Sequence, residues 1–102
     1  PFLFDVIATP VIAREQVTFH LMHNRPESRM RVGIMVYDLA GRQLWKHEES
    51  GTSGLFENYT VSWDLTSGGV RMRPGVYIYR AAISTDNSKD ATKARKFIIL
   101  GE

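Results

Sequence analysis

The sequence contains no cysteine. This absence excludes disulfide bonds, thiolate metal sites and a cysteine nucleophile within its 102 residues. No apolar run approaches the roughly 18 residues that a membrane-spanning helix needs, so we expect no direct insertion into a membrane. The start of the chain also lacks the basic and then apolar pattern of a secretory signal. It begins directly in an apolar, strand-like stretch, which indicates a domain taken from a longer protein.

An excess of one charge is also missing. The 13 Lys and Arg residues nearly balance the 11 Asp and Glu residues, and the longest basic run is Arg95-Lys96. Nucleic-acid-binding domains usually carry a basic patch or stripe, so we expect no nucleic-acid partner. With 43% hydrophobic residues, the chain has the composition of a folded globular protein. We therefore predict a single domain over residues 1–102.

What the sequence does contain is alternation of apolar and polar side chains with a period of two. The clearest example follows the turn signal Pro74-Gly75. Successive side chains of a strand point to opposite faces. Tyr77 and Tyr79 share one parity and are predicted to face the core. The other parity is also partly apolar, so this strand is expected to be central and covered on both faces.

Similar alternation recurs along the whole chain, and no stretch shows the period of a helix. Seven short strands are predicted, at residues 2–8, 16–23, 30–37, 42–48, 59–64, 74–83 and 93–100. Such a pattern favours an all-β fold, a seven-stranded antiparallel immunoglobulin-like β-sandwich. Residues 49–58, 65–75 and 84–92 are expected to be loops, and the glycine-rich segment 65–75 is the best candidate for a crossover between sheets.

The parity of each strand also predicts the core. It should contain Phe19, Leu21, Val32, Ile34, Val36, Val61, Trp63, Tyr77 and Tyr79. In the strand at 42–48 the alternation is weaker, and Leu44 is its expected anchor.

Histidines and carboxylates give no support for a catalytic or metal site. His20 and His23 lie three residues apart on a predicted strand, so they point to opposite faces and cannot share a metal ion. We expect both, together with the isolated His47, to be surface residues. Glu48 and Glu49 are adjacent on a strand and diverge. No serine has the G-x-S-x-G context of a nucleophile. No catalytic residue and no cofactor is therefore predicted.

One segment imitates a calcium-binding loop. Asp86, Ser88 and Asp90 match its first ligand positions. The sixth and twelfth positions hold Ala91 and Phe97, where the loop needs Gly and Glu. A polar hairpin tip is the better interpretation, and no metal site is predicted.

A docking surface is the one functional feature that parity predicts. The outward parity of residues 31–37 and of residues 76–82 is partly apolar and is fringed by arginine, which is a composition typical of interfaces. If the two strands are neighbours, the candidate partner-binding residues are Arg31, Met35, Tyr37, Val76, Ile78 and Arg80. A partner protein or another region of the same polypeptide would cover this face. A second possible route is edge pairing by the last strand, whose "FIIL" (97–100) is apolar on both parities.

Three stretches occur in an order typical of a known family: "VGIMVYDLAGRQLW" (32–45), "VSWDLTSGGVRMRPGVYIYRA" (61–81) and "KARKFIIL" (93–100). Together they resemble the C-terminal domains of proteins handled by the Bacteroidetes type IX secretion system. They are also similar to the immunoglobulin-like domain of flagellar hook-capping proteins. Within the secretion group the sequence looks most like the C-terminal domain of the sortase, a gingipain-like cysteine peptidase. The longer connection before the "PGVYIYR" strand favours the sortase over exported cargo.

This resemblance implies a non-catalytic role for the domain. It would anchor the sortase to an outer-membrane barrel protein of the PorV type, or pack on the upstream catalytic region, where the catalytic Cys and His would lie. The implied location is the outer membrane or cell surface, reached through the periplasm. Two alternatives remain open, a cleavable export signal of a cargo protein and a hook-cap-like structural module.

Overall fold

The computed structural model describes residues 3–25, 29–52, 58–86 and 88–101, and within these ranges it contains strands but no helix. No described segment is therefore a helix long and apolar enough to cross a membrane. The strands are β1 (Phe4–Thr9), β2 (Ile12–Ala13), β3 (Val17–His23), β4 (Arg29–Tyr37), β5 (Gln43–Thr52), β6 (Asn58–Trp63), β7 (Thr66–Ser67), β8 (Val70–Arg71), β9 (Gly75–Thr85) and β10 (Ser88–Ile99).

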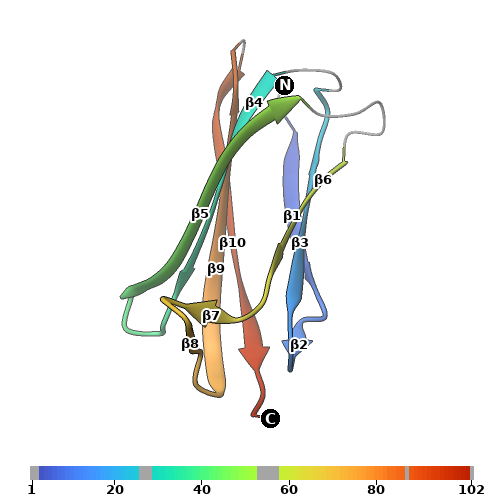
Figure 1. The fold of residues 1–102 in the computed structure, drawn as a ribbon. Coiled ribbons are helices and arrows are strands. Elements are labelled where there is room, and N and C mark those ends of the chain that lie inside the picture. The colour runs from blue at the N-terminus through green and yellow to red at the C-terminus, as the bar shows by residue number, and fades with distance from the viewer. Residues whose placement is uncertain (1–2, 26–28, 53–57, 87, 102) are drawn as a thin grey trace.

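Two sheets lie face to face (Figure 1). One has the order β1-β3-β6 and the other the order β2-β10-β9-β4-β5, while β7 and β8 form a small separate hairpin. This arrangement confirms the predicted all-β sandwich of immunoglobulin-like topology. The seven predicted strands correspond to the seven long ones, and the three additional strands have two residues each. Pairing is antiparallel throughout the described ladders except between β2 and β10, which run parallel.

Between the sheets lies one hydrophobic core. All nine residues predicted from parity are buried in it. Aromatic rings form its centre: Phe19 contacts Tyr79 with ring centroids 5.2 Å apart, and Trp63 stacks on Trp45 at 4.5 Å. Such ring pairs add to the gain from area burial alone. The core is thus built from inward residues of both sheets, as strand alternation requires.

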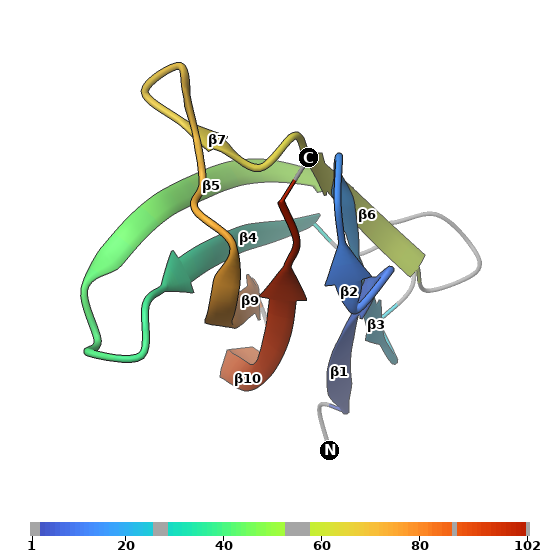
Figure 2. The same cartoon turned by 90° about the horizontal axis from the view of Figure 1, so that it is seen from below.

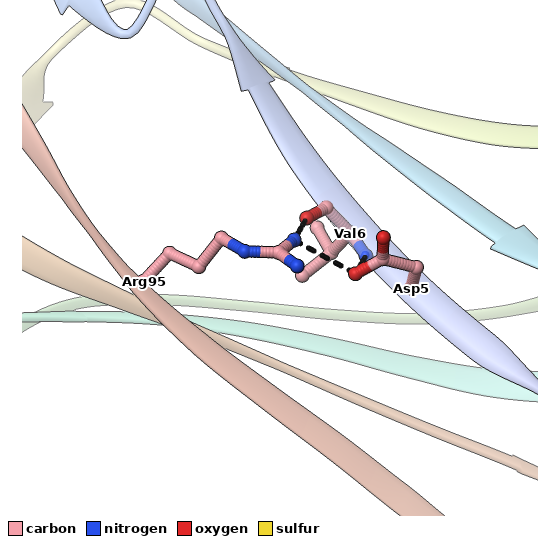
Figure 3. A network of polar contacts seen from close by, with 3 residues as sticks. All are labelled: Asp5, Val6 and Arg95. Carbon is pink, nitrogen blue, oxygen red and sulfur yellow. Dashed lines mark hydrogen bonds and ion pairs between the residues drawn. The ribbon is translucent and has the colours of Figure 1, made fainter.

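One open side of the sandwich is closed by a polar bridge between the two sheets (Figure 3). The Arg95 guanidinium on β10 donates a hydrogen bond to the Asp5 carboxylate on β1 at 2.7 Å, and another to the carbonyl oxygen of Val6. The hydrogen bond from Arg95 is the main reason why the pKa of Asp5 is lowered. Because the Val6 carbonyl lies on the free edge of β1, this bridge also satisfies part of that edge.

The connection at 65–75 is more ordered than the loop expected from its glycines. It contains the β7–β8 hairpin, whose turn places Gly68 at φ 60° and Gly69 at φ 81°. On either side of the hairpin, Leu65 and Met72 are buried, and the Met72 amide donates to the Leu65 carbonyl at 2.8 Å. The two apolar side chains anchor the hairpin to the end of the core, where Figure 2 shows it from below.

A hydrogen bond characteristic of immunoglobulin-like folds forms where β9 begins. The Tyr77 hydroxyl donates to the carbonyl oxygen of Arg73 at 2.6 Å. A tyrosine at the start of this strand that bonds backbone a few residues upstream is the tyrosine corner of such sandwiches. The bond explains how a buried phenol at the end of the core is satisfied.

The chain changes sheets between β1 and β2, where the Thr9–Pro10 peptide bond is cis. β2 then lies beside the end of β10, with Ile12 opposite Ile98 and Ala13 opposite Ile99. The Leu100 amide donates to the Ala13 carbonyl at 2.8 Å, which continues this ladder. The edge of "FIIL" is therefore already occupied within the domain, which argues against the edge-pairing route.

Strand ends differ from the sequence-based prediction at two places. β5 extends to Thr52 instead of ending at 48, and the expected loop at 84–92 is largely strand, since β9 ends at Thr85 and β10 begins at Ser88. In β5 the inward residue opposite Val36 is Trp45. Leu44 is only partly buried against the core, as Trp45 is, so Trp45 shares the role of anchor predicted for Leu44 alone.

Candidate docking surface

The outward face of the five-stranded sheet carries all six predicted partner-binding residues, with Arg31, opposite Ser84, and Val76 toward opposite ends of it. β4 and β9 are antiparallel neighbours, and their register places Met35 opposite Arg80 and Tyr37 opposite Ile78. Inward residues of both strands are buried, so the alternate residues must face outward. The condition attached to this surface in the sequence, that the two strands are neighbours, is therefore met. The six residues are Arg31, Met35, Tyr37, Val76, Ile78 and Arg80.

We call this surface the outer face. Its apolar part is only partly covered: Val76 is 39% exposed, while Met35, Tyr37 and Ile78 are intermediate. Arg31 and Arg80 are exposed. The outer face is therefore a mixed surface with three half-buried apolar side chains, one exposed valine and two exposed arginines.

Flanking strands extend the outer face on both sides. On β10, Ile98 lies opposite Val76 and Lys96 lies opposite Ile78. On β5, Lys46 lies opposite Met35. These residues were missing from the sequence-based set. Alternation within a strand shows which of its residues share a face. It does not show which strands lie beside β4 and β9, because that depends on the order of strands in the sheet.

Two open hollows lie on this face. The first has a volume of about 480 Å³ and is lined by Gly33 and Ala82, which are paired directly across β4 and β9. Because Gly33 has no side chain and Ala82 has only a methyl group, the surface is recessed there. Longer side chains surround them, namely those of Arg31, Met35, Lys46 and Glu48.

The second hollow, about 370 Å³, lies toward the β4–β5 hairpin and is lined by Tyr37, Leu39, Ile78 and Arg80, among others. The hairpin that borders it is held by Asp38, whose carboxylate accepts hydrogen bonds from the amides of Ala40 and Arg42 at 3.0 and 2.9 Å.

Charges on the outer face are unevenly paired. Lys46 forms an ion pair with Glu48 at 2.7 Å, and this contact raises the pKa of Lys46. Arg31 lies 3.8 Å from Asp86. Among the residues that the structure describes, no ion pair is found for Arg80 or Lys96. The side of the face near β10 is therefore positively charged, and the described part of the chain places no carboxylate in an ion pair with these two cations.

The outward face of the three-stranded sheet is different in kind. Its polar side chains bond one another across strands, with Thr9 2.7 Å from His20 and Thr18 3.0 Å from Ser62. Exposed apolar side chains occur there at Ile7 and Met22. This face provides matched positions for control variants.

The histidines lie partly where they were expected. His20 and His23 do point to opposite faces of β3, as predicted. His23, however, is buried, and its Nδ1 accepts a hydrogen bond from the Arg25 amide at 3.0 Å, so its assignment to the surface was wrong. His47 is half-buried, stacks on Trp45 with ring centroids 6.0 Å apart and lies 3.2 Å from Glu49.

Within the described ranges, no three His, Cys, Asp or Glu residues gather into a group that would hold a metal ion. The side chains of Ser88 and Asp90, which imitate a calcium loop in the sequence, lie outside the described residues. The absence of a cofactor and of catalysis in this chain stays a prediction.

This chain is similar in fold and sequence to a known protein structure. No family model matches the chain, and no curated protein matches it. Among solved structures, the chain is similar to dimeric latent PorU from Porphyromonas gingivalis, with 32% sequence identity and a TM-score of 0.84. The match covers the whole of this chain and 10% of the PorU chain. The chain therefore spans about a tenth of the length of that protein.

Both the fold and a moderate level of sequence identity support this likeness. It confirms the predicted resemblance to the C-terminal domain of a sortase of this kind.

Proposed function

We propose that this PorU-like domain is a non-catalytic docking module of a type IX secretion sortase, and that it anchors the enzyme to an outer-membrane barrel protein of the PorV type. The observation that carries the proposal is the match to PorU over the full length of the chain. Because the match covers only 10% of the PorU chain, it is consistent with a single accessory domain of a larger protein. On this proposal, peptide-bond chemistry belongs to the remainder of the parent protein, at the cell surface.

The outer face is the proposed contact. Met35, Ile78 and Val76 give it apolar area, and Arg80 provides charge at its margin. Interfaces that bind stably combine a partly apolar centre with a polar rim. The strands that form this face are held rigidly by the core beneath them, so little order would be lost on binding.

Charge substitution tests this contact in the full-length protein. Met35→Glu combined with Ile78→Glu places two carboxylates in the apolar part of the outer face, and both side chains already reach solvent. We expect co-purification with the barrel protein to be lost while the protein remains folded. Ile7→Glu combined with Met22→Glu makes the same change on the opposite sheet and should leave binding intact. Equal binding by the Met35/Ile78 variant and the wild type would show that another surface is used.

Retention of the domain separates a sortase anchor from an export signal. A cleavable signal would be absent from the mature surface protein, whereas an anchor would remain. Intact-mass measurement on surface-exposed parent protein distinguishes the two, and we expect the mass to include residues 1–102. A mass lower by the whole domain would favour the cargo alternative. A hook-cap-like structural module would show neither dependence on the secretion system nor barrel binding.

A further inference from the structure

Arg80 and Lys96, for which the described residues provide no ion pair, have a defined spatial relation on the outer face. Lys96 on β10 is opposite Ile78, and Arg80 is the next outward residue of β9 after Ile78. The two charges are therefore diagonal neighbours across one pair of strands, within the distance at which side chains on a sheet interact. Placing two like charges side by side without a counterion is unfavourable, and an anionic ligand relieves the repulsion.

This cationic pair lies between apolar features. Ile78 is its immediate neighbour, and Val76 and Ile98 continue beyond it. On the other side, Met35 lies opposite Arg80 and lines the hollow at Gly33 and Ala82. A ligand that covers the cations would also reach the apolar groups on both sides. An inorganic anion would meet the charges alone.

The hollow at Gly33 adds a steric requirement. A Cβ built at Gly33 would lie 3.6 Å from Met35 Sδ and 3.9 Å from Glu48 Cγ, which are ordinary contact distances. Nothing in the local packing or the backbone angle therefore demands glycine at this strand position, where glycine is usually unfavourable. The space above it is what a larger side chain would remove. The lining of the hollow is mixed, with charged side chains at Arg31, Lys46, Glu48 and Glu49. A partner side chain that enters it would place its apolar part against Met35 and Ala82.

We propose that the outer face recognises an acidic protein surface, in which carboxylates pair with Arg80 and Lys96 and one large apolar side chain enters the hollow at Gly33 and Ala82. This inference rests on the proposed docking function and adds the chemistry of the partner. A protein surface fits better than an anionic lipid surface, because the hollow at Gly33 and Ala82 is recessed and would receive a side chain of the partner, whereas lipids are contacted by protruding apolar groups of the protein.

Two test variants of the full-length protein, each with a control variant, test the inference by co-purification with the barrel protein and by its affinity at low and high salt. Arg80→Glu with Lys96→Glu reverses the cationic pair. Its control, Arg73→Glu with Lys93→Glu, changes the net charge equally at exposed positions that do not belong to the outer face. We expect at least tenfold weaker binding for the first and less than twofold change for the second. Salt should weaken wild-type binding, because the charge contacts are exposed to screening.

Gly33→Val tests the hollow without introducing charge. A β-branched residue is favoured in a strand, so this variant should be at least as stable as the wild type and yet bind at least tenfold more weakly. Ser62→Val is its control, because it adds a β-branched side chain to the outer surface of the other sheet. A Gly33→Val protein that is folded and binds normally would exclude the hollow from the contact.

The outcomes separate the inference from the proposed function. If the wild type binds the barrel protein and the Arg80/Lys96 and Gly33 variants bind equally well, the inference is wrong while the docking function stands. If the wild type does not bind the barrel protein, the proposed function fails and the inference fails with it. Vesicles with 30% anionic phospholipid are a further probe. Binding to them that depends on Arg80 and Lys96 would replace the protein partner by a lipid surface and overturn the inference.

Discussion

Trp63→Ala should be the most destabilising single substitution on β6. Trp63 is 4% exposed, stacks on Trp45 at 4.5 Å and meets Phe97 edge-on at 6.5 Å. Its indole N–H also donates to the Thr66 carbonyl oxygen at 2.8 Å. Removing a buried large aromatic side chain typically costs about 3–5 kcal/mol. The stack on Trp45 contributes about 0.5–1.5 kcal/mol beyond area burial, and this contribution is already included in the total cost of removing the side chain. We therefore expect a loss of about 4 kcal/mol in the free energy of unfolding.

Urea denaturation followed by far-UV circular dichroism measures this loss. For a chain of this size, 1 kcal/mol shifts Tm by about 4–8 °C, so the melting temperature should fall by roughly 15–30 °C. Trp63→Phe retains one ring and lacks the N–H donor, and should lose about 1–2 kcal/mol, mainly from the hydrogen bond and the reduced contact area. Trp45→Ala, at a half-buried partner, should lie between the two. A change below about 1 kcal/mol for Trp63→Ala would refute the reasoning, because it would mean that the ring leaves no cavity behind.

Three further predictions concern stability. Asp5→Asn should be less stable than the wild type at pH 7, and the difference in stability should disappear in acid. Arg95 lowers the pKa of Asp5, so the ionised carboxylate stabilises the fold at pH values above its ordinary pKa of 3.8, and this stabilisation is lost as the pH falls through the lowered pKa. Thermal melts between pH 2 and 7 measure the difference, and a difference that persists at pH 2 would contradict the prediction. Tyr77→Phe should cost about 1 kcal/mol in urea denaturation by removing the bond to the Arg73 carbonyl, and an unchanged midpoint would show that this bond is not formed. Gly69→Ala should cost about 1 kcal/mol because φ is 81° there, although space for a Cβ is open, and Gly69→Asn should cost less.

Sequence alternation predicted most of the fold because the strands at the centre of each sheet bury one parity. The inward face of β4 is identified by Val32, Ile34 and Val36, and that of β9 by Tyr77 and Tyr79. The extent of β5 was harder to predict from the sequence, because β5 is an edge strand. Its inward parity continues from Trp45 to His47 and Glu49, which are polar, and edge strands commonly carry such charges. An apolar pattern therefore ended several residues before the strand did.

The candidate surface was predictable only in part for a related reason. Parity identifies which side chains of one strand share a face, so Met35 and Ile78 were found. Sheet order decides what lies beside them, and it depends on contacts between segments far apart in the chain. Lys96 and Lys46 belong to the surface because the sheet order places β10 beside β9 and β5 beside β4. The hollow at Gly33 could not be predicted from the sequence either, because a glycine within a strand is as consistent with a bulge or a close backbone contact as with an empty space.

The parallel pairing of β2 with the end of β10 determines how the domain responds to tension. β1 begins at one end of the sandwich and β10 finishes at the other (Figure 1). A pull on the two termini draws β2 and β10 in opposite directions along their length. Hydrogen bonds between parallel strands are then loaded in shear and must fail together, whereas antiparallel strands pulled from one end open one bond at a time. The Arg71 side chain adds a hydrogen bond to the Leu100 carbonyl at 2.9 Å next to this ladder. Extension of the domain along its long axis would therefore load the β2–β10 ladder in shear.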